Sequence, residues 1–178
     1  MNNTQLSNTK NDIIEFVSAI ITNKNGNPLI IIRLDTLKLD PGKFDMCSGH
    51  MKKNECPMQS MYRELKEEVG IEHYDIKRME KLGDIPTPHP KFPNTTTHIY
   101  HVLIDLSIEE INKRIKETED REMDFALYLE SVDYLRRMHI EKDLIRIKYT
   151  EEIEKVYQLL EQKLNDRKER EENKCEEK

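Results

Sequence analysis

Alternating apolar and polar segments along the chain predict a series of strands. Two runs rich in β-branched residues, Ile13–Ile21 and Leu29–Leu34, flank the pair Asn25-Gly26. An Asn-Gly pair between two such runs is typical of a β-hairpin, so we expect these strands to pair with each other. Further strands are predicted within residues 43–47, 74–85, 98–106 and 124–131.

Other segments carry an apolar residue every three or four positions, and this spacing predicts helices. The clearest is Pro57–Val69, whose apolar residues form one stripe that can pack against a sheet. Proline is favoured at the first helical position, and Gly70 suits the left-handed turn that ends a helix. Helices are also predicted over 108–119 and 131–138, and from about residue 141 onward. We therefore expect an α+β fold with a mixed central β-sheet sandwiched between α-helices.

The size of the chain suits one globular domain with a polar extension. It has 178 residues, of which 36% are apolar and 36% are charged. We expect a flexible leader over 1–11, one domain over 12–165 and a charged C-terminal tail over 166–178. The apolar positions of the last helix are Ile145, Ile153, Val156, Leu160 and Leu164. This stripe predicts packing on the domain, and the seam of a homodimer is the open alternative.

The charge and the cysteine content argue against several classes of protein. A net charge of −6 does not favour nucleic-acid binding, and no apolar run approaches the length of a membrane span. The polar first residues do not predict a signal peptide. Cys47, Cys56 and Cys175 lie at unrelated spacings, which argues against a disulfide framework or a zinc site. We expect a cytoplasmic protein that binds neither nucleic acid nor a membrane.

Three glutamates stand close together in the helix predicted over Pro57–Val69. Glu64, Glu67 and Glu68 occupy positions i, i+3 and i+4, so they share one helical face beside the apolar stripe. Like charges at this spacing destabilise a helix by roughly a few tenths of a kcal/mol per pair. A divalent cation would remove the repulsion, since ions such as Mg²⁺ prefer oxygen ligands. The alternative is the solvated face of an ordinary surface helix.

The residues around these glutamates form a longer pattern with fixed spacing. Its nine defined positions are Gly49, Glu55, Arg63, Glu64, Leu65, Glu67, Glu68, Gly70 and Ile71. The pattern matches the Nudix box at every defined position, so the chain resembles the Nudix hydrolase superfamily. The strand hairpin predicted before the box, and the strand predicted after the long loop that follows it, are also similar to the family.

The resemblance implies the reaction and the residues that carry it. Nudix enzymes cleave a diphosphate linkage, typically in a nucleoside diphosphate joined to another group, by attack of water on phosphorus in the presence of Mg²⁺ or Mn²⁺. By position in the box, Glu67 and Glu68 are the expected principal metal ligands. Glu64 is expected to be a further ligand or the general base. The backbone carbonyl of Gly49 is expected to add one more oxygen ligand.

Some relatives place the general base on a loop after the box rather than within it. Here the charged segment before residue 123 offers Glu119 and Glu122 as catalytic candidates, and we favour Glu122. A solvated acidic run is the alternative for both residues. Arg63 and Glu55 match the structural ion pair of the family, which ties the loop to the helix.

The resemblance leaves the reaction class and the exact substrate open. Isopentenyl diphosphate isomerases share the fold, but their catalytic cysteine directly precedes the box glycine, where this chain has Ser48, with Cys47 one residue away. We expect Cys47 to be a small core residue. A non-catalytic Nudix-fold binding protein is the other alternative, although such a protein is expected to lose box glutamates. The loop that contains His89, Lys91 and Phe92 is a candidate for recognising the small-molecule substrate.

Overall fold

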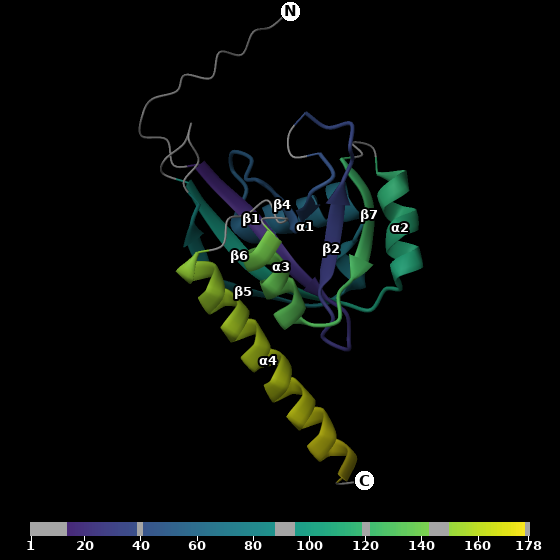
Figure 1. Cartoon of the computed structure of the whole chain (residues 1–178), viewed down its shortest axis with the longest axis vertical. Helices are drawn as coiled ribbons and strands as arrows, with labels where there is room; N and C mark the ends of the chain where they lie inside the picture. The colour runs from purple at the N-terminus through teal and green to yellow at the C-terminus, as the bar shows by residue number, and fades with distance from the viewer. Residues whose placement is uncertain (1–13, 39–40, 88–94, 119–121, 143–149, 177–178) are drawn as a thin grey trace, which may run out of the picture.

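The computed structural model describes residues 14–38, 41–87, 95–118, 122–142 and 150–176, which form seven strands and four α-helices (Figure 1). The strands are β1 (Ile14–Thr22), β2 (Leu29–Arg33), β3 (Phe44–Asp45), β4 (Cys47–His50), β5 (Ile76–Pro86), β6 (Thr95–Ile104) and β7 (Met123–Tyr128). The helices are α1 (Pro57–Val69), α2 (Ile108–Glu117), α3 (Val132–Lys142) and α4 (Glu151–Glu176), and the 3-10 turn η1 (His73–Asp75) follows α1. The bounds predicted for the helix of the box are confirmed.

The strands are arranged in two sheets. The larger sheet has the order β4-β1-β6-β5, and the smaller sheet has the order β3-β2-β7. In the larger sheet β1 runs parallel to β6, whereas the pairs β1–β4 and β5–β6 are antiparallel. The mixed sheet that the sequence predicts is therefore confirmed, and part of the predicted strands form a second, antiparallel sheet beside it.

The prediction that the first two strands form a hairpin is wrong. A turn does form, with Gly26 at a φ of 83°, and Thr22 pairs with Pro28 in one antiparallel bridge. Beyond this bridge the strands separate, because β4 and β6 already occupy the two edges of β1. Strand β2 instead becomes the centre of the smaller sheet. This places the end of β2, at Arg33, between β3 and the start of β7.

Two hydrophobic cores lie on opposite faces of the strands. The neighbouring residues Ile30 and Ile31 of β2 point to opposite faces and belong to different cores. One core contains Leu65 of α1 and Ile111 of α2. The other contains Tyr157 of α4 together with residues of α3. Figure 1 shows α3 and α4 in front of the larger sheet and α2 beside β7. The predicted arrangement, with helices on both sides of the sheet, is confirmed.

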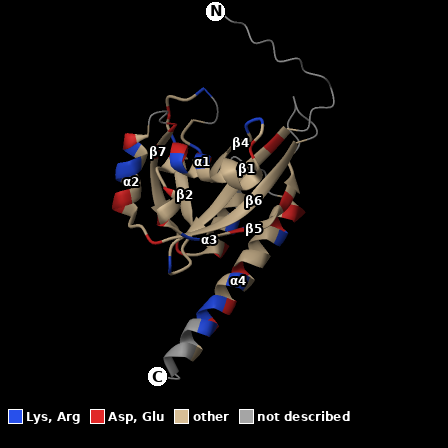
Figure 2. Ribbon diagram, turned by 180° about the vertical axis from the view of Figure 1, so that it is seen from behind, with Lys and Arg blue, Asp and Glu red and all other residues tan. Residues whose placement is uncertain are grey.

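The C-terminal helix α4 packs on the domain through the stripe that the sequence predicts. Ile153, Val156, Leu160 and Leu164 are each no more than 9% exposed, while Ile145 lies outside the described residues. Beyond Leu164 the helix continues as a charged segment that extends away from the body (Figure 2). None of the helices described here combines the length and the apolar sequence that a membrane crossing requires. The homodimer and the division into leader, domain and tail stay predictions.

Candidate active site

Helix α1 is fixed by its two ends and by its apolar stripe. The Cys56 N–H donates to the side-chain oxygen of Gln59 at 2.9 Å, which satisfies one of the free donors at the start of the helix. At the other end Gly70 adopts a left-handed φ of 69°. Met61 and Leu65 are fully buried beneath the helix. Glu64 and Glu68, beside this stripe, therefore lie next to the core, against strand β4.

The backbone of β4 fits closely against two of these carboxylates. The Ser48 N–H donates a hydrogen bond to Oε2 of Glu68 at 2.9 Å. A Cβ atom at Gly49 would lie only 2.0 Å from Cδ of Glu64, so a larger residue would displace that carboxylate. The space beside Gly49 is therefore filled by the side chain of Glu64, which gives a reason for a glycine at this position that the pattern alone does not show.

Burial makes two of the carboxylates hard to ionise. Glu64 is 7% exposed, and its burial raises its pKa above 4.5 although the neighbouring Arg63 acts in the opposite direction. Glu68 is partly exposed, and its carboxylate lies against the backbone of β4, where it accepts the Ser48 N–H. Burial raises the pKa of Glu68 well above 4.5, and the charges of Asp45 and Glu64 raise it further. A cation beside these groups would favour their ionised forms.

Arg63 is a cation that contacts three acids of the box. Its Nε and Nη2 donate to the two carboxylate oxygens of Glu55 at 2.8 and 2.9 Å, so the predicted ion pair is confirmed and is bidentate. This pairing holds the pKa of Glu55 well below its usual range. The Arg63 Nη1 contacts Glu64 and donates to Oε2 of Glu67 at 2.9 Å, and Nη2 also donates to the His50 carbonyl at 2.9 Å.

The donor set of the site fits a hard divalent cation. Glu64, Glu67, Glu68 and the carbonyl of Gly49 offer only oxygen atoms, which are the ligands that Mg²⁺ and Mn²⁺ prefer. Two of these carboxylates already contact a positive group, the guanidinium of Arg63. Among the described residues no three His, Cys, Asp or Glu side chains are already arranged around one point suited to a metal ion. Binding a cation through Glu64 and Glu67 would therefore require these two side chains to turn away from Arg63.

Glu122, the candidate base outside the box, lies just before β7 with 51% of its side chain exposed. Its Oε2 is 3.3 Å from Nη2 of Arg33, and Nη1 of the same arginine is 3.5 Å from Oδ2 of Asp45. Asp45 is fully buried and its charge acts on Glu68. Arg33 and Asp45 thus link Glu122 to the box. The other candidate, Glu119, lies outside the described residues.

Sequence reasoning misses Arg33 and Asp45, although each interrupts an apolar segment, in "LIIIRL" and "FDMC". A charged residue within a buried strand needs a partner, and that signal could have singled out both positions. It could not have shown that they are partners of each other and of a residue far along the chain. The loop residues His89, Lys91 and Phe92 lie outside the described part of the chain.

Cys47 behaves as the small core residue that the sequence predicts. It is 1% exposed and belongs to the core beneath α1. Burial raises the pKa of its thiol well above 9.0, and the charges of Glu68 and Glu64 add to the effect. A thiol that resists ionisation is a poor nucleophile, so the surroundings of Cys47 do not favour the isomerase chemistry.

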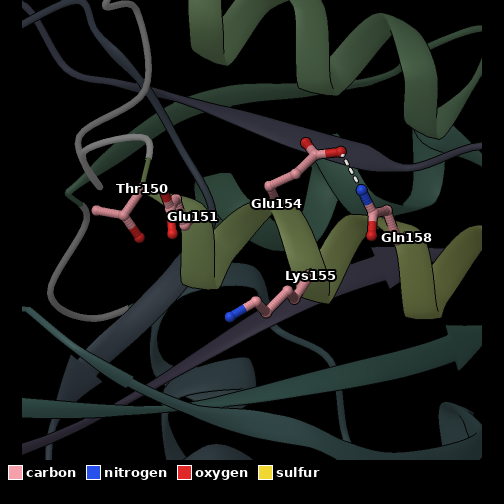
Figure 3. A pocket seen from close by; sticks show the side chains of 5 residues that line it. All are labelled: Thr150, Glu151, Glu154, Lys155 and Gln158. Atoms are coloured by element: carbon pink, nitrogen blue, oxygen red, sulfur yellow. Dashed lines mark hydrogen bonds between the residues drawn. The ribbon is translucent and has the colours of Figure 1, made fainter.

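A hollow of about 500 Å³ lies along the first turns of α4 (Figure 3). It is lined by Thr150, Glu151, Glu154, Lys155 and Gln158. The Nε2 of Gln158 donates to Oε1 of Glu154 at 2.8 Å across this surface. Helices α4 and α1 belong to different hydrophobic cores, and the hollow shares no residue with the box. The site that the box predicts is therefore separate from this hollow.

Solved structures of low sequence identity share the fold of this chain. A MutT protein from Methanosarcina mazei has a TM-score of 0.60 at 15% identity, over 85% of this chain and 94% of that one. A protein from Deinococcus radiodurans has a TM-score of 0.58 at 17% identity, over 82% of each chain. The NUDIX domain of Shewanella oneidensis NrtR, solved with ADP ribose, has a TM-score of 0.51 at 13% identity, over 70% of this chain and 77% of that one. No curated protein matches the chain.

The match of the sequence itself extends well beyond the box. The family model of the NUDIX domain covers residues 15–160, from the first described strand into α4. This span contains every defined position of the box and both residues that link Glu122 to it. The chain belongs to the NUDIX family, as the box indicates, and is a Nudix pyrophosphohydrolase.

Proposed function

We propose that this Nudix pyrophosphohydrolase requires Mg²⁺ or Mn²⁺ and cleaves the diphosphate linkage of a nucleoside diphosphate joined to another group. The observation that carries the proposal is the gathering of Glu64, Glu67 and Glu68 on one face of α1, two of them against β4. Half-buried acids with raised pKa values gain from a nearby cation. A diphosphate brings further oxygen ligands of the kind that Mg²⁺ takes together with one or two carboxylates.

Each residue of the site has a defined role in this proposal. Glu64, Glu67, Glu68 and the carbonyl of Gly49 hold the cation, which when bound neutralises charge on the phosphate oxygens. Glu122 accepts a proton from the attacking water, and Glu64 is the alternative acceptor. The water oxygen forms a new bond to one phosphorus while the bridging P–O bond breaks. The bridging oxygen and its electron pair leave with the second phosphate.

The substrate class rests on chemistry and on one structural relative. The NUDIX domain of S. oneidensis NrtR was solved with ADP ribose, which is a nucleoside diphosphate joined to a sugar. We propose a small molecule of this class as the partner of this chain. We also propose a cytoplasmic location, because three cysteines at unrelated spacings do not predict a disulfide framework, and proteins of a reducing compartment rarely have one.

A substrate panel tests the proposal. ADP-ribose, a dinucleoside polyphosphate, a nucleoside triphosphate and isopentenyl diphosphate would each be incubated with Mg²⁺, with Mn²⁺ or with a chelator. We expect release of a nucleoside monophosphate that depends on the cation. Glu68→Gln should lower kcat by about 100-fold or more, since charge stabilisation by a bound cation is worth several kcal/mol. Glu169→Gln, an exposed change on α4, is the matched control.

The outcomes separate the rival functions. Full activity in the chelator would refute the requirement for a cation, and full activity of Glu68→Gln would refute the site. An isomerised product from isopentenyl diphosphate would support the isomerase alternative. Tight binding of a nucleotide without turnover would support the non-catalytic binding protein.

A further inference from the structure

A buried arginine spans the two strands beside it and contacts an acid on each side. Arg33 ends β2 and is 4% exposed. Its Nη1 is 3.5 Å from Asp45 on β3, and its Nη2 is 3.3 Å from Glu122 ahead of β7. Backbone hydrogen bonds join the same three segments. The Arg33 N–H donates to the Lys43 carbonyl and the Leu34 N–H donates to the Glu122 carbonyl, each at 3.0 Å.

A β-bulge shapes this end of the smaller sheet. Strands β2 and β7 pair in regular register as far as Ile32 and Phe125, but Arg33 then lies opposite Met123 rather than Asp124. A bulge of this kind re-aims the side chains next to it and is frequent beside active sites. The shift of one residue brings Glu122 closer to the end of β2, within reach of Arg33.

Stability alone does not account for this arrangement. The Arg33 Nε is buried and has no hydrogen-bond partner among the described residues. Its two ion-pair distances, 3.3 and 3.5 Å, are also longer than those of a strong charged hydrogen bond. A buried ion pair with incomplete hydrogen bonding contributes little to stability, because desolvation offsets the attraction. A buried polar atom without a partner is rare in folded proteins and calls for another explanation.

We propose that Arg33 is a positioning residue that holds the carboxylate of Glu122 at the active site through its pair with Asp45. The inference rests on the proposed function, in which Glu122 accepts the proton of the attacking water. Asp45 is itself fixed, because it is fully buried and its Oδ1 accepts the Met46 N–H at 2.9 Å. Glu122 is half exposed and would otherwise sample several rotamers in water. Arg33 therefore sets the distance between the base and the glutamates of the box.

A double-mutant cycle with Arg33→Gln and Glu122→Gln tests the proposal in the intact chain with Mg²⁺. If Arg33 acts through Glu122, Arg33→Gln should lower kcat by about 10- to 100-fold, since misplacing a catalytic group by about 1 Å has an effect of this size. KM should change by less than about 2-fold, and Arg33→Gln should cost little further activity in the Glu122→Gln background. Arg33→Lys keeps the charge but not the fork that reaches two acids, so it should restore only part of kcat.

The control is Arg136→Gln, which removes an arginine that joins Asp133 and Glu154 between α3 and α4. It should leave kcat unchanged. Equal fold-losses from Arg33→Gln in both backgrounds would overturn the proposal, as would failure of both Arg33 variants to fold, since either result makes Arg33 a purely structural residue. If the wild-type chain hydrolyses no diphosphate, both proposals fall; if it is active and the losses are additive, only the role of Arg33 falls.

Discussion

Replacing Glu68 by glutamine should stabilise the cation-free protein while it removes most of the turnover. The Glu68 carboxylate accepts the Ser48 N–H and is close to the charges of Asp45 and Glu64. Its negative charge is therefore poorly solvated. Glutamine has nearly the same shape, and its amide oxygen can still accept the bond from Ser48. The substitution removes the charge and keeps the contact.

The magnitude and the pH dependence follow from the raised pKa of Glu68. The unfolded chain releases this proton near pH 4.5, whereas the folded chain retains it to a higher pH. The stability that this proton contributes is present below pH 4.5 and is lost as the pH rises toward the folded pKa, at up to about 1.4 kcal/mol per pH unit. Solvent that reaches part of the residue reduces the effect. We expect Glu68→Gln to gain about 1 kcal/mol at about pH 7.5, or roughly 2–4 °C in Tm.

Thermal unfolding in a chelator, at about pH 4.5 and about pH 7.5, measures this gain, with Glu169→Gln as the control. The wild type and Glu68→Gln should have nearly equal Tm values at the lower pH, because both then carry a neutral side chain at position 68. Added Mg²⁺ should raise the Tm of the wild type more than that of Glu68→Gln, since a ligand stabilises the state that binds it. A variant that is less stable than the wild type by the same amount at both pH values would refute the reasoning.

Two further substitutions test the geometry of the site and the place of α4. Gly49→Ala puts a methyl group 2.0 Å from Cδ of Glu64. We expect kcat to fall about 100-fold, because the carboxylate is displaced from its position. The Tm should change by less than about 4 °C, because the flexible side chain can move aside. Gly83→Ala is the control for kinetics and melting, since a Cβ there meets nothing within 4 Å; equal kcat values for the two variants would contradict the close fit. Leu160→Ala, at a fully buried position of α4, should lower the free energy of unfolding in urea by about 2–5 kcal/mol. The partly exposed Leu159→Ala should cost less, and an unchanged transition for Leu160→Ala would show that α4 is not part of one cooperative domain.

The parts of the fold that the sequence predicts are those governed by local signals. Pro57 and Gly70 mark the ends of α1 through backbone preferences that act within a few residues, and the structure has the same bounds. The turn at Gly26 is also local and does form. Whether the strands beside that turn pair with each other depends on β4 and β6, which come from elsewhere in the chain and take both edges of β1. No local pattern contains that information.

The candidate site likewise has one part that local spacing predicts and one part that depends on long-range contacts. The glutamates of the box lie within one helix, so their spacing alone predicts a shared face. The link from Asp45 through Arg33 to Glu122 joins three segments whose residues are 12 and 89 positions apart. It exists because β2 leaves β1 and enters the smaller sheet between β3 and β7. Glu122, the candidate base that the sequence favours, is the residue whose position depends on this long-range arrangement.

The charges of the box also differ in how well the cation-free protein compensates them. Arg63 forms ion pairs with Glu64 and Glu67, and Lys52 Nζ lies 3.3 Å from Glu67 as well. Among the described residues Glu68 forms no ion pair with a lysine or an arginine, so a bound cation would relieve its charge most. What holds the acids in place is the apolar stripe of α1, because each fully buried large side chain such as Leu65 contributes about 1.5–3 kcal/mol. That gain exceeds the roughly few tenths of a kcal/mol lost to each exposed pair of like charges, so the helix can fold with its acids together before any cation arrives.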